Sequence, residues 1–205
     1  MTRLVGALLG AAALAAVVGP APASAADPDE LMPCKILLVK NTGGINGKTK
    51  IVCKGTFALP SAAAAPSGAG VVVDVNIVPP GTTPPTGIPV VPCVGLGNPA
   101  GSAGYKCKDP VTTSLALIKP NVVKVVIKDF DVPAVDYLTG HPYPSGTDVA
   151  IRVISYGATG SKQYCARFGG PPAIKDTTTL YKRKDAPAPA ACSPSGAFLD
   201  DGEIL

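Results

Sequence analysis

The sequence predicts an all-β fold made of two related halves and held together by disulfide bonds. Pro and Gly occur 23 times each, which favours turns and short strands and disfavours long helices, whose interiors both residues disrupt. Short runs rich in Val, Ile and Leu recur between these turn residues, as expected for strands. Six cysteines are present, and one series of strand patterns occurs twice in the same order.

The first 25 residues have the features of a secretory signal peptide. Arg3 supplies a positive charge, an uncharged run of Leu, Ala, Val and Gly follows, and Ala23 and Ala25 fit the small-x-small pattern before a cleavage site. The run is shorter than the ~20 apolar residues that a membrane-spanning helix needs. We therefore expect cleavage after Ala25, or alternatively after Ala26, and export of a mature chain of about 180 residues.

The strand candidates fall into two sets separated by turn-rich segments. They are residues 35–40, 50–57, 71–78 and 90–94 in the first set, and 115–119, 122–130, 148–156 and 163–167 in the second, with a further short strand at 178–182. The linkers 61–69, 79–89 and 185–194 are rich in Ala, Pro, Gly or Thr. We expect about eight strands, in either one pseudo-symmetric sandwich or two small packed β-units.

An internal repeat relates the two sets of strands. The Lys-flanked strand at Lys50 returns at Lys124, and the Tyr-Lys-x-Lys-Asp motif at Tyr105 returns at Tyr181. Matched residues lie about 75 positions apart, which predicts a tandem duplication with a unit of that length. The predicted divisions are a signal peptide at 1–25, a first β-repeat at 26–110, a second at 111–192 and an acidic C-terminal tail at 193–205.

The repeat also predicts how the six cysteines pair. Cys34 and Cys53 lie opposite each other in the first hairpin, and the second copy has Ser114 and Ile127 at the matching positions. Two cysteines that bond to each other are expected to be present together in one copy and absent together from the other. Residues opposite each other on neighbouring strands are also close enough to form a disulfide. One further pair then remains within each copy. The predicted disulfides are Cys34–Cys53, Cys93–Cys107 and Cys165–Cys192, each expected to contribute about 2–4 kcal/mol.

Three motifs support a family resemblance. They are Val-Cys-Lys-Gly at 52–55, Tyr-Cys-Ala-Arg-Phe-Gly-Gly at 164–170 and Lys-Asp-Ala-Pro-Ala-Pro-Ala-Ala-Cys at 184–192. They resemble motifs of a family of exported bacterial cysteine-containing β-domains of unknown function. The resemblance implies that the chain is exported and that it has the domain organisation of this family, and it assigns no site residues. The second copy departs from the pattern at Ser114 and Ile127, where the cysteines are missing.

The sequence contains no recognisable catalytic, cofactor-binding or metal site. The only histidine, His141, lies between Gly and Pro in a predicted loop, and no Gly-x-Ser-x-Gly elbow is present. Asp129, Asp131, Asp136 and Asp148 form an acidic cluster whose spacing matches no calcium-binding loop. No Cys-x-x-C pair occurs, and neither does a phosphate-binding or dinucleotide-binding motif. We expect these acids to be solvated and no cofactor to be bound.

The two Tyr-Lys-x-Lys-Asp motifs have two interpretations. Strand alternation places Lys106 and Lys108 on one face and Tyr105 on the other. The preferred interpretation is structural, with Tyr packed in the core and Lys protecting a sheet edge. The alternative is a paired basic surface for an anionic glycan. Removal of Arg3 lowers the formal net charge from +4 to +3, which does not favour nucleic acid as a partner.

These features predict an exported, non-catalytic module that binds an envelope component or glycan, or that has a structural role. One alternative is a secreted hydrolase whose carboxylates meet only in the fold. Another is a protease-inhibitor-like scaffold that presents the loop at 79–89. We expect the periplasm, the cell surface or the medium as the final location, with no transmembrane segment after signal cleavage.

Overall fold

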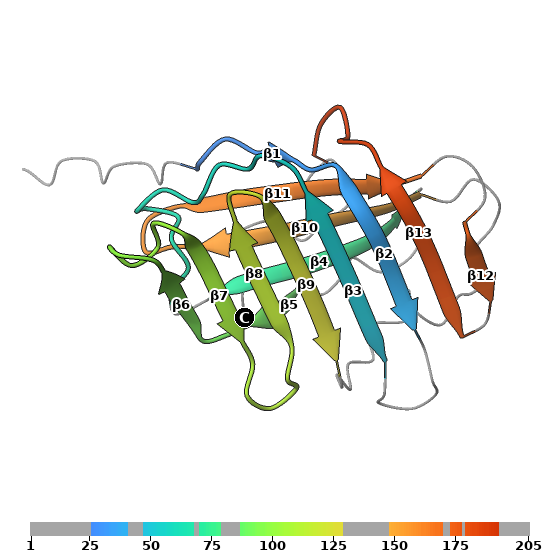
Figure 1. Cartoon of the computed structure of the whole chain (residues 1–205), viewed down its shortest axis with the longest axis horizontal. Helices are drawn as coiled ribbons and strands as arrows, with labels where there is room; N and C mark the ends of the chain where they lie inside the picture. Colours follow the sequence, from blue (N-terminus) through green and yellow to red (C-terminus); the bar gives the residue numbers. More distant parts are fainter. Residues whose placement is uncertain are drawn as a thin grey trace, which may run out of the picture.

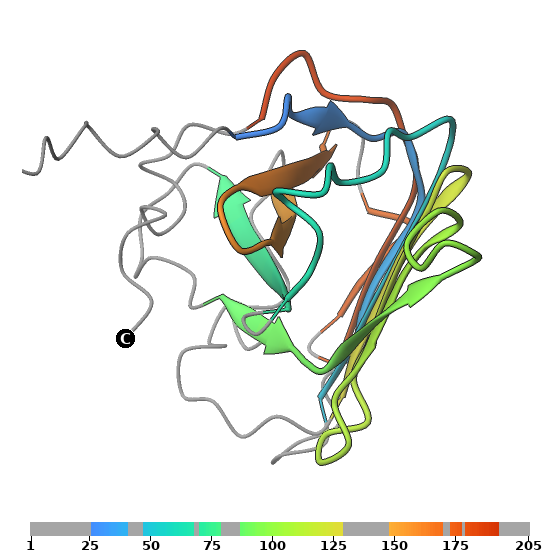
Figure 2. The same cartoon turned by 90° about the vertical axis from the view of Figure 1, so that its left-hand side faces the viewer.

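The computed structural model describes residues 26–40, 47–67, 70–78, 87–128, 148–169, 173–177 and 179–192. Within these ranges the protein has no helix, and its strands form two sheets that pack face to face (Figure 1; Figure 2), which confirms the predicted fold class. The predicted signal peptide at 1–25 and the predicted acidic tail at 193–205 lie outside the described residues. So do His141, Asp129, Asp131, Asp136 and most of the loop at 79–89.

The larger sheet is entirely antiparallel. Its strands follow the order β12 (Lys175–Thr177), β13 (Leu180–Ala186), β2 (Cys34–Lys40), β3 (Lys48–Lys54), β9 (Val122–Lys128), β8 (Leu115–Lys119), β7 (Gly104–Lys108) and β6 (Cys93–Leu96). The hairpins β2–β3 and β8–β9 are the two Lys-flanked hairpins of the repeat, and they lie together at the centre of this sheet.

The smaller sheet crosses behind the larger one at a steep angle (Figure 1). Its strands follow the order β1 (Glu30–Leu31), β11 (Ser161–Phe168), β10 (Asp148–Tyr156), β4 (Val71–Val78) and β5 (Ile88–Val90). β1 runs parallel to β11, and the other neighbours are antiparallel. The side chains that face the larger sheet, such as Val73 and Ile151, pack against Leu37, Ile51 and Val125 in one buried core.

The strand predictions need two corrections. The prediction of about eight strands is too low, because the described ranges contain thirteen, several of them only two to five residues long. The predicted strand at 90–94 is in fact two strands in different sheets, since β5 ends at Val90 and β6 begins at Cys93. Pro92 lies between them, and proline has no backbone N–H to donate to a continuous ladder.

Strands from the two predicted repeats pair with each other in both sheets. β3 pairs with β9, β4 pairs with β10, and β13 pairs with β2. The described residues therefore form a single two-sheet structure and not two separate β-units. The strand order is the same in both directions from the boundary between β3 and β9. On one side the hairpin β3–β2 is followed by β13, and on the other the hairpin β9–β8 is followed by β7, and both β13 and β7 carry the Tyr-Lys-x-Lys pattern. Two copies related by a two-fold axis would give this order. The duplication itself stays a prediction.

The three disulfides join the predicted partners. Cys34–Cys53 links β2 to β3, and Cys93–Cys107 links β6 to β7. Cys165–Cys192 links β11 of the smaller sheet to the chain that follows β13 of the larger sheet. Three disulfides are typical of a protein that folds in an oxidising compartment.

A buried ion pair lies where β4 meets β10. The register places Asp74 directly opposite Arg152. Arg152 Nε donates to Asp74 Oδ2 at 3.2 Å, and a terminal guanidinium nitrogen lies 3.1 Å from the same oxygen. Arg152 also donates to Gln163 Oε1 at 3.3 Å. The side chains of Arg152 and Asp74 are only 5% and 3% exposed, so solvent contributes little to compensating either charge.

Candidate functional site

The outer face of the larger sheet carries most of the lysines of the chain. Inward-facing positions hold core residues such as Leu37, Ile51 and Ile118, and the alternate positions point away from the smaller sheet. We call this outward side the lysine face. Its lysines are Lys40, Lys48, Lys50, Lys54, Lys106, Lys108, Lys119, Lys124, Lys128, Lys175, Lys182 and Lys184. Of the two remaining lysines, Lys162 is buried on β11, and Lys35, at the register shift between Cys34 and Ile36, forms an ion pair with Asp185.

The register of the sheet arranges six of these lysines in two rows that cross the strands. The first row runs from β13 to β7 through Lys182, Leu38, Lys50, Val126, Leu115 and Lys108. The second row runs beside it through Lys184, Ile36, Val52, Lys124, Leu117 and Lys106. Neighbouring strands are about 4.8 Å apart, so each row is about 24 Å long, and the rows are about 7 Å apart along the strands.

The charge of the lysine face is of one sign. No acidic residue occupies a position in either row. Among the described residues, no carboxylate forms a salt bridge with any of the twelve lysines. The aliphatic side chains between the lysines are half-buried, and no other described strand covers this side of the sheet (Figure 2). The face is therefore a broad, open, cationic surface with short apolar patches between the charges.

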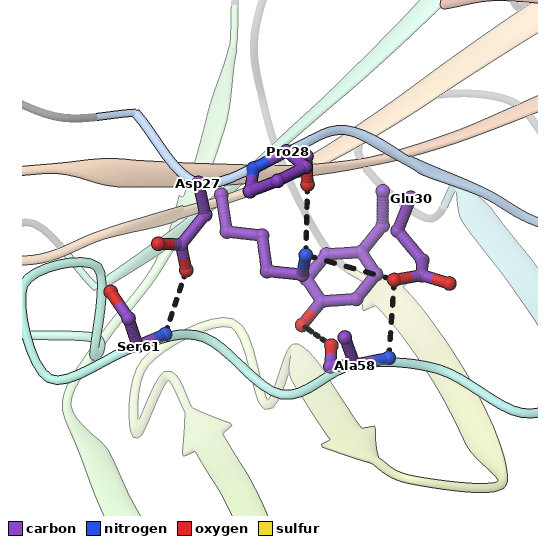
Figure 3. Close-up of polar contacts among 7 residues, drawn as sticks. Asp27, Pro28, Glu30, Ala58 and Ser61 are labelled. Carbon is purple, nitrogen blue, oxygen red and sulfur yellow. Dashed lines mark hydrogen bonds and ion pairs between the residues drawn. The ribbon is translucent and has the colours of Figure 1, made fainter.

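A second polar cluster connects the segment 27–30, near the beginning of the described chain, to the rest of the fold. Lys162, on β11, has a side chain that is only 3% exposed, and its Nζ donates to the Pro28 carbonyl oxygen at 2.8 Å. The same Nζ lies 3.6 Å from Glu30 Oε2, which also accepts from the Ala58 amide at 3.1 Å (Figure 3). Because each charged group has a partner inside the protein, we interpret this cluster as structural.

Tyr164 also belongs to this cluster, and its buried hydroxyl makes the free energy of unfolding depend on pH in the alkaline range. Its hydroxyl donates to the Ala58 carbonyl oxygen at 2.8 Å, while Asp27 accepts from the Ser61 amide at 2.7 Å nearby (Figure 3). Burial raises the pKa of Tyr164 far above its ordinary value of 10.0, and the negative charges of Glu30 and Asp27 raise this pKa further.

We expect the free energy of unfolding to fall as pH rises above 10. In that range the unfolded chain releases the Tyr164 proton and the folded chain keeps it, so each pH unit costs about 1.4 kcal/mol. Denaturant unfolding at a series of pH values measures this slope. Burial also raises the pKa of Tyr181, so Tyr181 contributes to the slope as well. The Tyr164→Phe variant keeps Tyr181, and the difference in slope between the native protein and this variant therefore gives the contribution of Tyr164 alone. A phenolate signal from Tyr164 near pH 10 in the folded protein would contradict the prediction.

A cavity of about 330 Å³ opens where the ends of β11 and β13 meet. Its lining includes Ile174, which is 60% exposed, together with Arg183 and Asp185. Arg183 Nε donates to the Tyr181 hydroxyl at 2.8 Å, and Asp185 forms an ion pair with Lys35 at 3.2 Å. Lys184 of the second row also lines the cavity. Since Arg183 and Asp185 already contact protein side chains, the cavity offers a ligand fewer charged contacts than the lysine face.

The structure places only part of the acidic cluster that the sequence suggested. Asp148 begins β10, where its carboxylate accepts from Arg167 Nε at 2.8 Å. The other three aspartates, like His141, are outside the described residues. Within the described ranges no group of three or more His, Cys, Asp or Glu side chains is placed to hold a metal ion.

The lysine face is the feature that sequence reasoning largely missed. Alternation correctly placed Lys106 and Lys108 on one side of β7, with Tyr105 opposite Ile118 on the inner side. The remaining lysines could be assigned to the same surface only through strand order and register, which join segments far apart in the chain. The signal available beforehand was the repeated alternation of Lys with aliphatic residues along each predicted strand.

Together these features define an all-β, disulfide-linked protein with one extended cationic sheet face. Comparisons with protein-family models, with curated proteins and with solved structures each gave no match. In the described part of the chain, no helix has the length and apolar character needed to cross a membrane.

Proposed function

We propose that this protein is an exported, non-catalytic module that binds an acidic polysaccharide of the cell envelope through its lysine face. The observation that carries the proposal is the gathering of twelve lysines on one open sheet face, without an acidic residue in either central row. Individual exposed ion pairs contribute only about 0.2–1 kcal/mol. Many such contacts along one polymer add up to useful affinity, because a second contact on a bound chain is effectively intramolecular.

The composition of the face favours carboxylate or sulfate groups on a glycan over nucleic acid. Every cation on it is lysine, and arginine, the usual choice for bidentate phosphate recognition, is absent from it. Tyr181 is buried in the core and Tyr105 lies on the inner side of β7, so neither presents to the lysine face a ring on which bases stack. The short apolar patches between the lysines instead suit the C–H faces of sugar rings.

The same composition disfavours a lipid bilayer as the partner. The exposed large apolar side chains of the described chain are Val94, Val111 and Ile174, and of these Val94, on β6, adjoins the second row opposite Lys106. A single valine at the end of one row, with no aromatic side chain beside it, is a weak anchor for a membrane interface. The predicted signal peptide and the disulfides support export, and an envelope polysaccharide is accessible from the periplasm, the cell surface or the medium.

The test is retention of the mature chain, from Ala26, on immobilised polyuronate and on a neutral polysaccharide. We expect retention on the polyuronate at about 0.1 M salt and release near 1 M, where the Debye length falls to about 3 Å. The neutral polysaccharide should not retain the protein. Equal retention on both matrices would overturn the proposal, as would tighter binding to anionic lipid vesicles or duplex DNA than to the polyuronate.

A further inference from the structure

The two lysine rows have the same pattern when they are read in opposite directions. From β13 to β7 the first row reads Lys, Leu, Lys, Val, Leu, Lys. From β7 to β13 the second row reads Lys, Leu, Lys, Val, Ile, Lys. The only difference between the rows is Leu115 in one and Ile36 in the other, which are aliphatic side chains of equal size.

A local two-fold axis perpendicular to the sheet accounts for this pattern. It passes between Ile51 and Val125, which are directly opposite each other in the β3–β9 pair. This pair of strands lies at the centre of the larger sheet (Figure 1). Rotation about this axis exchanges Lys50 with Lys124, and it exchanges the β13 end of each row with the β7 end of the other. Across these six strands the cationic band therefore presents matching residues to a ligand from either end. The equivalence stops at the outermost strands, where Lys175 of β12 lies opposite Lys182 and Val94 of β6 lies opposite Lys106.

The dimensions of the band fit one extended chain lying between the two rows. The rows are about 7 Å apart, and long flexible lysine side chains from both can reach the line midway between them. Three cations on each side then flank a polyanion over about 24 Å. A second chain in the same band would be repelled by the like charges of the first at this short separation.

We propose that a single linear polycarboxylate glycan lies between the rows, across the strands, and binds equally well in both chain directions. This inference rests on the proposed function. Binding then requires a run of regularly charged internal residues and no particular chain end, so the protein attaches anywhere along a long polymer. The protein then does not distinguish the two directions of the glycan chain, because the two rows match over the six strands that the chain crosses.

The experiment uses a linear oligogalacturonate that spans about 24 Å and carries a nitroxide at its reducing end. Line broadening of backbone amides is measured by NMR in the full mature protein. We expect equal broadening at Lys106 and Lys108 on β7 and at Lys182 and Lys184 on β13, because both directions are populated equally. Broadening confined to one of these strands, or spread evenly across the sheet, would overturn the inference.

Two matched variants provide an independent measure. Lys106→Gln and Lys182→Gln remove lysines that the two-fold axis exchanges, so each should weaken binding of the unlabelled oligogalacturonate by the same factor. A difference of about fivefold or more between them would contradict direction-independent binding. Failure of the native protein to bind the unlabelled oligomer would instead overturn the proposed function, which separates the two outcomes.

Discussion

Replacement of the six row lysines by glutamine is expected to lower the affinity for polyuronate about 100-fold. The positions are Lys50, Lys106, Lys108, Lys124, Lys182 and Lys184. At about 0.5 kcal/mol for each exposed contact, their combined loss is about 3 kcal/mol, and 1.4 kcal/mol corresponds to a factor of ten. The dissociation constant at about 0.1 M salt, measured by titration calorimetry or by the retention assay, gives the result directly.

The same face offers a control with an equal change in net charge. Glutamine at Lys40, Lys48, Lys54, Lys119, Lys128 and Lys175 also removes six positive charges. The first five lie outside the two rows, and Lys175 lies on β12, just beyond the β13 end of the first row. We expect this variant to bind about tenfold less tightly than the native protein, through weakened long-range attraction alone. If the two variants lost affinity equally, binding would depend on total charge and not on the rows. The thermal unfolding midpoint of each variant checks that it is folded.

Replacement of Arg152 by methionine is expected to lower the free energy of unfolding by about 3–5 kcal/mol. The change removes the guanidinium that faces Asp74 at 3.1–3.2 Å, and Asp74 is left with its charge in a site that is only 3% exposed. Denaturant unfolding under conditions that keep the three disulfides intact measures the loss. The double variant Asp74→Leu with Arg152→Met should recover most of it, because no buried charge then needs compensation.

Arg167→Met serves as the matched control for burial. Arg167 forms a similar ion pair with Asp148 at 2.7 Å, but its side chain is 47% exposed. Solvent screening limits such a pair to about 1 kcal/mol or less, so this variant should remain close to the native protein in stability. If Arg167→Met and Arg152→Met lowered the free energy of unfolding equally, burial would not be the reason why the Asp74–Arg152 pair stabilises the fold.

The sequence alone determined the local features of this protein. Strand character follows from runs of Val, Ile and Leu between turn residues, and β4, β8 and β10 begin and end at the predicted positions. Cysteine pairing also followed from local pattern, because two of the three disulfides join neighbouring strands of one hairpin-like unit. The break between β5 and β6 was missed, since consecutive apolar residues at 90–94 do not reveal a change of sheet at Pro92.

The tertiary structure decided how these strands combine, and with that the candidate site. Lys50 and Lys124 are about 75 positions apart in the chain, yet they flank the centre of the same cationic band because β3 pairs with β9 in one particular register. A shift of that register by one residue would move one of the two lysines to the inner face. Periodicity along one strand gives the side of a sheet on which a residue lies, and only pairing between distant strands places such residues together on one surface.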